Sequence, residues 1–186
     1  MYRAATRSIL DSGISFEKNS SVIETVKKTA IDIDNSPGFE KILINGKDKT
    51  STLKTPEIDR AVSIVSKIPE VRKELVRRQR NIASQGPIVM VGRDIGSVVL
   101  PEAELRIYLD ASVEIRAQRR YQEQIASEGK LSMKDVKVDL EKRDFIDTQR
   151  QDSPLSKYDF YTIIDTTMMS LKDVVNEITS IYRSQI

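Results

Sequence analysis

Three short apolar runs constrain the fold of this chain most strongly. They are PIVMV (87–91), LRIYL (105–109) and YTIID (161–165), and segments with helical periodicity separate and follow them. A run of this length that stays apolar on both faces is typical of a strand buried in a parallel sheet. Buried strands that alternate with helices predict an α/β fold, in which ligands bind beyond the carboxyl ends of the strands.

Turn and capping residues predict a small β structure in the first half of the chain. The first helix is expected to stop at Gly13, and a second to begin near Ser21, where Glu24 completes a capping box. Between β-prone stretches, Asn45-Gly46 is the dipeptide of a tight hairpin turn. Because helical segments flank this hairpin, it is expected to be an appended insertion.

Five more helices are expected around the apolar runs. Proline is favourable at a first helical position, because the missing N–H needs no partner there. The helices are expected to open at Thr55-Pro56, at Pro69, near residue 113, at Ser132 and at Ser170 with Asp173. Those in the second half alternate with the apolar runs, which supports a parallel sheet.

Two residue types that commonly carry catalysis are absent. The 186 residues include no cysteine and no histidine, which excludes disulfides, thiol nucleophiles, imidazole bases and metal sites built from these side chains. We expect no dedicated metal site, so the chemistry must come from carboxylates, arginine, lysine, hydroxyls or a cofactor. Phosphoryl transfer suits this composition, because it depends mainly on positioning and charge neutralisation.

Charge is balanced overall and clustered locally. The 30 basic and 28 acidic side chains leave a net charge of +2, too little to indicate bulk nucleic-acid binding. Nucleic-acid binding by the basic segment 71–80 is a lower-ranked alternative, since this segment lacks interleaved aromatic residues. Within it, Arg72 borders an apolar stripe, whereas Arg77, Arg78 and Arg80 are expected to face solvent.

The charged pair Arg93-Asp94 lies where the first apolar run ends. One interpretation is a structural turn capped by Asp94, and the other is a ligand site at the carboxyl end of a strand. Arginines also gather on the helix expected from residue 113, at Arg116, Arg119 and Arg120. Arginine-bearing elements around the edge of a parallel sheet are typical of sites that hold phosphate-rich ligands.

The helix expected from Ser132 carries a face that changes from apolar to charged. At helical spacing the face is formed by Val136, Leu140, Arg143, Asp147 and Arg150. In one interpretation the helix end is solvated and Arg143 pairs with Asp147 at i, i+4. In the other, the face continues over a polar cleft and presents two guanidinium groups to an anion.

Four segments together resemble the bacterial cytidylate kinase family in content and in order. They are TPEIDRAVSIVSKIPEVRKELVRRQR (55–80), GRDIGSVVLPEAELRIYLDAS (92–112), IRAQRRY (115–121) and RDFIDTQRQDSPL (143–155). The resemblance implies transfer of the γ-phosphate of ATP to CMP or dCMP with Mg²⁺. It also implies an α/β fold with a three-layer parallel sheet of the P-loop nucleoside monophosphate kinase type and a small β-hairpin insertion.

The resemblance assigns roles to residues that match the family's motifs. Arg93 and Arg3 match arginines that grip the CMP phosphate. Ser63, Arg72 and Asp94 match positions that read the cytosine ring, whose edge needs both a donor and an acceptor.

Three residues of the charged helix face are assigned in the same way. Asp147 matches a carboxylate that accepts hydrogen bonds from the sugar hydroxyls, and Arg143 and Arg150 match arginines that close over phosphate and sugar. With Arg93, these two arginines form the catalytic set that the resemblance implies.

The resemblance also divides the chain. Residues 1–186 are expected to form a single nucleoside monophosphate kinase domain, with a monophosphate-binding insertion at 38–85 and a mobile lid at 115–150. The lid arginines would neutralise charge on the transferring phosphoryl group, and they are Arg116, Arg119 and Arg120.

One family feature is absent from this sequence. No GxxxxGK[ST] phosphate loop occurs, and Met1-Tyr2-Arg3 aligns just after the family's second core strand. The first two core strands are therefore expected to be missing, through a misassigned start, a fragment or a true truncation. The chain alone is expected to be inactive, and the alternative is a pseudokinase that binds CMP without ATP turnover. Val91 and Lys54 are smaller departures from the family pattern.

The expected partners are small nucleotides, namely CMP, dCMP and ATP, with UMP as the runner-up acceptor. No nucleic acid or membrane partner is expected, and the protein is expected to be a monomer. The apolar stretches are too short to span a membrane, and the N-terminal MYRAATRSIL lacks the apolar centre of a secretory signal. These features predict a cytoplasmic location.

Overall fold

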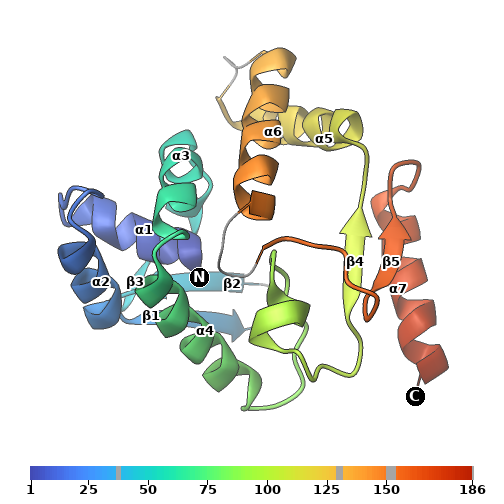
Figure 1. The fold of residues 1–186 in the computed structure, drawn as a ribbon, viewed down its shortest axis with the longest axis horizontal. Coiled ribbons are helices and arrows are strands. Elements are labelled where there is room, and N and C mark those ends of the chain that lie inside the picture. Colours follow the sequence, from blue (N-terminus) through green and yellow to red (C-terminus); the bar gives the residue numbers. More distant parts are fainter. Residues whose placement is uncertain (37–38, 129–131, 150–153, 186) are drawn as a thin grey trace. The chain divides into compact units, whose positions relative to one another are not determined.

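The computed structural model describes residues 1–36, 39–128, 132–149 and 154–185 (Figure 1). It divides into two compact units, Met1–Met90 and Val91–Ile186. Helices surround an antiparallel sheet in the first unit and accompany a small parallel sheet in the second. The prediction of an α/β fold with a parallel sheet is therefore confirmed.

Four helices of the first unit follow its predicted punctuation closely. They are α1 (Tyr2–Asp11), α2 (Asn19–Lys28), α3 (Pro56–Val65) and α4 (Pro69–Ala83). Gly13, just beyond α1, has a φ of 66°, which favours glycine. The Thr55 hydroxyl accepts a hydrogen bond from Ile58 N at 3.4 Å, and so caps α3 as its position before Pro56 predicts.

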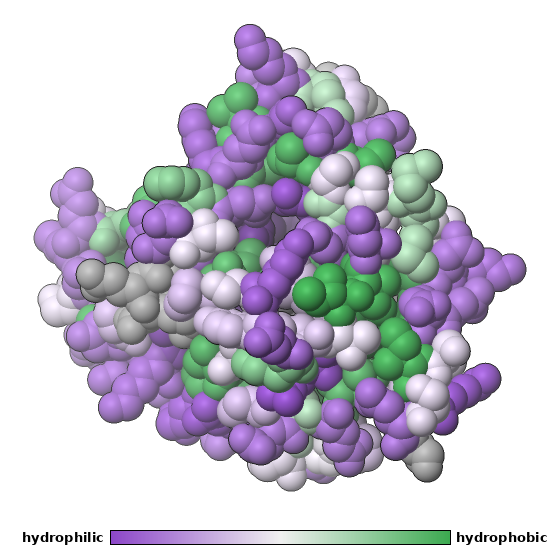
Figure 2. All heavy atoms as spheres, turned by 45° about the vertical axis from the view of Figure 1, so that its right-hand side comes forward, coloured by the Kyte–Doolittle hydropathy of each residue, from purple (hydrophilic) through white to green (hydrophobic). Residues whose placement is uncertain are grey.

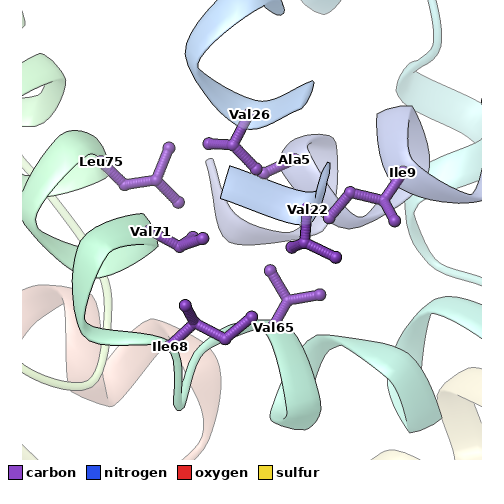
Figure 3. Packing of buried hydrophobic residues seen from close by; sticks show 8 residues of the cluster. All are labelled: Ala5, Ile9, Val22, Val26, Val65, Ile68, Val71 and Leu75. Atoms are coloured by element: carbon purple, nitrogen blue, oxygen red, sulfur yellow. The ribbon is translucent and has the colours of Figure 1, made fainter. Parts of the chain in front are cut away.

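The core of the first unit is formed where these helices meet (Figure 3). Its buried members come from α1, α2, the end of α3, α4 and the N-cap of α4, and they are Ala5, Ile9, Val22, Val26, Val65, Ile68, Val71 and Leu75. Burial of these aliphatic side chains supplies most of the stability of such a helix cluster, at about 25 cal/mol per Å² of apolar surface.

A three-stranded antiparallel sheet, in the order β1-β2-β3, lies in the first unit. Its strands are β1 (Ile31–Ser36), β2 (Phe39–Ile44) and β3 (Lys47–Asp48), and a short 3₁₀ turn, η1 (Thr50–Leu53), follows. Asn45 and Gly46 have φ values of 50° and 76°, so the predicted hairpin turn is confirmed. Ile44 pairs with Ile31, and it packs with Ala4 and Leu53 in a second apolar cluster.

Two predictions about the first unit are wrong. Helix α2 begins at Asn19 rather than near Ser21, and Glu24 forms an ion pair with Lys28 at 2.6 Å instead of a capping box. Arg78 does not face solvent, because its guanidinium donates to carbonyls at the end of α2, including Thr29 O at 2.5 Å. A helix end leaves carbonyls without intrahelical partners, and a tertiary contact of this kind cannot be read from spacing within α4.

The second unit contains a two-stranded parallel sheet. Strands β4 (Ile107–Asp110) and β5 (Thr162–Asp165) lie side by side and point the same way, with Ile107 opposite Thr162 (Figure 1). The runs predicted at 105–109 and 161–165 therefore form strands, and β4 extends one residue beyond its expected end.

The first apolar run, at 87–91, is not a strand. Val89 is 93% exposed and Val91 is 90% exposed. A strand requires a hydrogen-bonded neighbour, and within the described residues β4 and β5 pair only with each other. The apolar composition that predicted burial is thus present without the partner strand that burial requires.

Three helices complete the second unit: α5 (Val113–Glu128), α6 (Met133–Gln149) and α7 (Leu171–Gln185). The Ser132 hydroxyl accepts from Asp135 N at 3.2 Å at the start of α6. At the start of α7, Asp173 N donates to the Ser170 hydroxyl at 3.2 Å, and Ser170 N donates to the Asp173 carboxylate at 3.0 Å. Both predicted helix starts are confirmed, the second as a reciprocal capping box.

Apolar side chains remain at the surface of the second unit. No residue of α7 is buried, and Leu109, Ile163 and Leu171 are all exposed. Figure 2, which turns the side of Figure 1 bearing β4, β5 and α7 forward, shows patches of hydrophobic atoms at the surface. Within the described parts of the chain, no helix is both long enough and apolar enough to cross a membrane.

Candidate phosphate-binding site

The chain forms a wide helical turn after Arg93 and Asp94. The Asp94 carbonyl accepts hydrogen bonds from Val98 N at 3.0 Å and Val99 N at 3.2 Å, and residues Ile95–Val99 form a π-helical turn, η2. Turns of this width are rare and are frequent at functional sites. The Asp94 side chain is buried at the start of the turn.

Glycine at position 96 is required by a close approach. A Cβ there would lie 2.7 Å from Cε1 of Tyr161 and 3.3 Å from Cγ of Arg106. Arg106 is itself held, because its guanidinium lies 4.5 Å from the centroid of the Phe160 ring. The second glycine of the GRDIG motif therefore lets η2 pack against the aromatic group that precedes β5.

Charged side chains from three elements meet in the second unit. Arg93 Nη1 donates to Asp144 Oδ1 at 3.0 Å and lies 3.1 Å from Asp147 Oδ2. Arg116 of α5 donates to the other oxygen of Asp144. Arg143 Nε lies 3.8 Å from Asp147 Oδ2. We call these five side chains the arginine cluster.

The arginine cluster lies beyond the carboxyl end of β4. Arg116 Nε donates to Ala111 O at 3.0 Å, and Ala111 directly follows the last residue of that strand. The cluster contains three guanidinium groups and two carboxylates, so it carries an excess of positive charge. The carboxylate of Asp147 is buried, which strengthens its interaction with nearby charges.

Sequence reasoning placed Asp147 and Arg143 on one face of α6 and missed Asp144. Asp144 follows Arg143 by one residue and precedes Asp147 by three, so it lies on the neighbouring row of the helix. The i, i+3 spacing of the two aspartates was the available signal, because it places both carboxylates on adjoining rows of the helix. The structure shows Asp144 contacting both Arg93 and Arg116.

The other two predicted lid arginines lie elsewhere on α5. Arg119 donates to Thr166 O at 2.6 Å and to Met169 O at 3.1 Å, and so holds the turn between β5 and α7. Arg120 forms an ion pair with Glu123 at 3.2 Å. Arg116 is the lid arginine that belongs to the arginine cluster, through its contact with Asp144.

A second ion pair lies at the same end of the parallel sheet. Lys157 contacts the carboxylate of Asp110, the last residue of β4. This hydrogen bond raises the pKa of the Lys157 ammonium above its usual value. The hydroxyl of Thr167, together with its backbone N–H, lowers the pKa of Asp165 at the end of β5.

Three predicted site residues belong to the first unit. Arg3 of α1 donates to Leu53 O at 2.8 Å and pairs with Asp59 of α3. Arg72 of α4 is buried, and its guanidinium lies 5.8 Å from the centroid of the Tyr2 ring. Ser63 is half-buried on α3.

Arg150, predicted on the charged helix face, lies outside the described residues. Across the described parts of the chain, no three aspartate or glutamate side chains are grouped so as to hold a metal ion. Guanidinium groups gathered beyond the carboxyl end of a parallel strand are typical of α/β proteins that bind phosphorylated ligands.

Comparison with known proteins identifies the family. The model of the cytidylate kinase family matches residues 1–184. The cytidylate kinase of Geobacillus sp. (strain WCH70) is 40% identical over 186 residues, which cover 100% of this chain and 83% of that relative. The cytidylate kinases of Bacillus cereus (strain ATCC 10987 / NRS 248) and Bacillus thuringiensis (strain Al Hakam) are each 39% identical over 181 residues, covering 97% of this chain and 80% of each relative. The chain belongs to the cytidylate kinase family.

The family membership predicted from the motifs is thus confirmed, and with it a phosphotransferase of the nucleoside monophosphate kinase class. The comparisons do not support the expectation that this chain is inactive, nor the alternative of CMP binding without turnover. The expected absence of two core strands is likewise not confirmed.

Proposed function

We propose that the chain transfers the γ-phosphoryl group of ATP to CMP or dCMP, and that the arginine cluster binds the acceptor phosphate. A phosphate oxygen of CMP forms a bond to the γ-phosphorus, and the bond from that phosphorus to the β–γ bridging oxygen breaks. The products are CDP and ADP. Such a reaction requires positioned positive charge more than a protein nucleophile, which suits a chain without cysteine or histidine.

The observation that carries this proposal is the arrangement around Arg93. Both of its carboxylate contacts use Nη1, while a guanidinium has five N–H donors in a fixed fork. Arg93 can therefore keep its protein contacts while other donors bind a phosphate. Arg143, which approaches the same carboxylate of Asp147, brings a second fork to the same place.

The remaining nucleotide contacts are proposed from the match to the family's motifs. Asp147 accepts hydrogen bonds from the sugar hydroxyls, and Asp94, Arg72 and Ser63 read the cytosine edge. Burial of Asp94 and Arg72 supports this role, because buried polar groups discriminate strongly against a ligand that leaves them unpaired. Arg3 binds the acceptor phosphate.

The lid and the domain fold are likewise proposed from the match to the family's motifs. Residues 115–150 form a lid that closes over the nucleotides, with Arg116, Arg119 and Arg120 neutralising charge on the transferring phosphoryl group and Arg143 and Arg150 closing over phosphate and sugar. Residues 38–85 form the monophosphate-binding insertion. The small parallel sheet belongs to a three-layer nucleoside monophosphate kinase domain.

Magnesium enters this proposal only as a complex with ATP. The described residues contain no acidic cluster that could hold a metal ion. Mg²⁺ is commonly held by substrate phosphates with few protein ligands, and in that form it would neutralise charge on the ATP phosphates.

Titration calorimetry with CMP, dCMP and UMP on the 186-residue chain, paired with a coupled ADP-release assay, tests the proposal. Arg93→Ala should weaken CMP binding about 10- to 100-fold, the cost of losing one or two charge-assisted hydrogen bonds. Arg93→Lys should recover part of this loss, because it keeps the charge without the fork. The matched control is Arg183→Ala, which removes an exposed arginine of α7.

Equal CMP affinities for Arg93→Ala and Arg183→Ala would exclude the arginine cluster as the acceptor site. Absence of CMP binding by the wild-type chain would refute the proposed substrate, and tighter binding of UMP than of CMP would reassign it.

A further inference from the structure

The position of Asp144 between two arginines carries an inference beyond the family match. One carboxylate oxygen of Asp144 accepts from Arg93 at 3.0 Å, and the other accepts from Arg116. The two arginines come from different elements, the segment before η2 and helix α5. Asp144 therefore bridges them, with one oxygen for each guanidinium.

Each bridged arginine is also held by a second contact. Arg93 lies 3.1 Å from Asp147 Oδ2, and Arg116 donates through Nε to Ala111 O at 3.0 Å. Two fixed points on a guanidinium define both its position and its orientation, because the group is planar. Without Asp144, each arginine would retain one of these points.

The negative charge of Asp144 also offsets the repulsion between the two arginines. Two like charges held by one carboxylate repel each other, and at the half-exposed surface they would separate toward water if the intervening negative charge were absent. Long arginine side chains also regain rotamer freedom when released. If both guanidinium groups are already oriented toward the same point, less conformational entropy is lost when an anion binds.

We propose that Asp144 is a positioning residue, which holds Arg93 and Arg116 ready for the acceptor phosphate without binding the nucleotide itself. The inference rests on the proposed function of the arginine cluster, and it adds a coupling between Arg93, in the segment before η2, and Arg116 of helix α5. The carboxylate supports phosphate binding here, although its negative charge alone would oppose it.

The test compares three variants of α6 with the wild-type chain. Asp144→Asn removes the charge and leaves one side-chain oxygen, and Asp144→Glu keeps the charge on a longer side chain. Asp139→Asn is the matched control, since Asp139 is an exposed aspartate of the same helix. Binding of CMP and of inorganic phosphate is measured by calorimetry at fixed salt, and unfolding is measured in parallel.

Asp144→Asn should weaken CMP and phosphate binding about tenfold, equivalent to one charge-assisted hydrogen bond. Asp144→Glu should recover part of the affinity, and Asp139→Asn should change neither affinity. Combining Asp144→Asn with Arg116→Ala should weaken binding by less than the sum of the two separate effects, because both changes remove the contact between Asp144 and Arg116. A purely structural role would lower the unfolding midpoint and would not produce this non-additivity.

The outcomes separate this inference from the proposed function. Unchanged affinity in Asp144→Asn overturns the positioning role, and tighter binding overturns it as well, because the carboxylate would then compete with phosphate. If the wild-type chain binds inorganic phosphate and not CMP, the proposed substrate fails while the comparison of variants still decides the role of Asp144. If it binds neither, both proposals fail.

Discussion

Each of the two units of this molecule is stabilised by a different kind of interaction. The first unit packs aliphatic side chains from its helices into a buried cluster, and Ile9, Ile58 and Leu75 are fully enclosed. The second unit leaves α7 without a buried residue, and arginine contacts, ion pairs and helix caps join its elements beside a few buried apolar side chains such as Val99, Val136 and Ile164. The buried apolar clusters thus lie in one unit, whereas the arginine cluster lies in the other.

This difference affects how the candidate site responds to change. Apolar packing tolerates variation in pH and salt, because it does not depend on charge. Networks of partly exposed ion pairs are weakened by salt and by loss of a single member. The arginine cluster is therefore expected to be more sensitive to salt and to the loss of a single member than the buried core of the first unit.

The largest expected difference between the units comes from truncating one leucine in each. Leu75→Ala should destabilise the protein by about 2–5 kcal/mol, because it removes a fully buried side chain. Leu171→Ala should change the free energy of unfolding by less than about 0.5 kcal/mol, since Leu171 is 82% exposed. Urea unfolding followed by circular dichroism measures both, and equal effects would remove the contrast between the units.

A smaller effect is expected from the close approach at Gly96. Gly96→Ala should cost about 1–3 kcal/mol, because the new methyl group would meet the Tyr161 ring. Hydrogen exchange of the amides in η2 and β5 reports the local loss. Adding Tyr161→Ala should relieve the clash at Gly96, and failure of this second change to restore protection would show that steric contact is not the cause.

Loss of the cap on α7 should destabilise that helix by about 1 kcal/mol. Ser170→Ala removes the hydroxyl that accepts from Asp173 N, in a helix with no buried residue to compensate. Exchange of the α7 amides should accelerate, with Ser184→Ala at the other end of the helix as the control. Equal exchange in the two variants would indicate that α7 is stabilised by something other than its capping box.

The smallest expected effect is a pH dependence in the first unit. Hydrogen bonds from Arg77, and also from Arg78, lower the pKa of Glu74 to about 2. Because the pKa of Glu74 is lower in the folded state, these contacts stabilise the fold fully above the pKa of an unfolded glutamate, about 4.3, and are lost as the pH falls toward 2.

Glu74→Gln should therefore be less stable than the wild type at neutral pH, with a difference that shrinks on acidification. Unfolding midpoints measured at several pH values test this, with the exposed Glu70→Gln of the same helix as the control. A difference that stays constant down to pH 2 would contradict the assigned cause.

Local signals predicted much of the fold because they act within a few residues. Thr55 before Pro56, the Asn45-Gly46 turn, and Ser170 with Asp173 each form the predicted structure, and the residues that define each signal lie within three positions of one another. The partners of Arg78 could not be predicted from the same evidence, since they lie on another helix.

The errors share this physical origin. The run at 87–91 has the composition of a buried strand, but strand formation depends on a neighbour that its own residues do not specify. For the candidate site, the face of α6 correctly grouped Arg143 and Asp147, which lie 3.8 Å apart. It could not show that Asp144 contacts both Arg93 and Arg116, because those arginines lie on other elements.

The exposed apolar run at 88–91 has a consequence for how the protein behaves in concentrated solution. These four residues carry no charge, and β4 and β5 present strand edges that pair with no other strand among the described residues. Uncharged β-prone segments and open edges are where copies of a protein begin to aggregate, and flanking charges slow that process. Arg93 and Asp94 thus flank an aggregation-prone segment as well as the candidate site, and Val89→Lys should lengthen the time before turbidity appears.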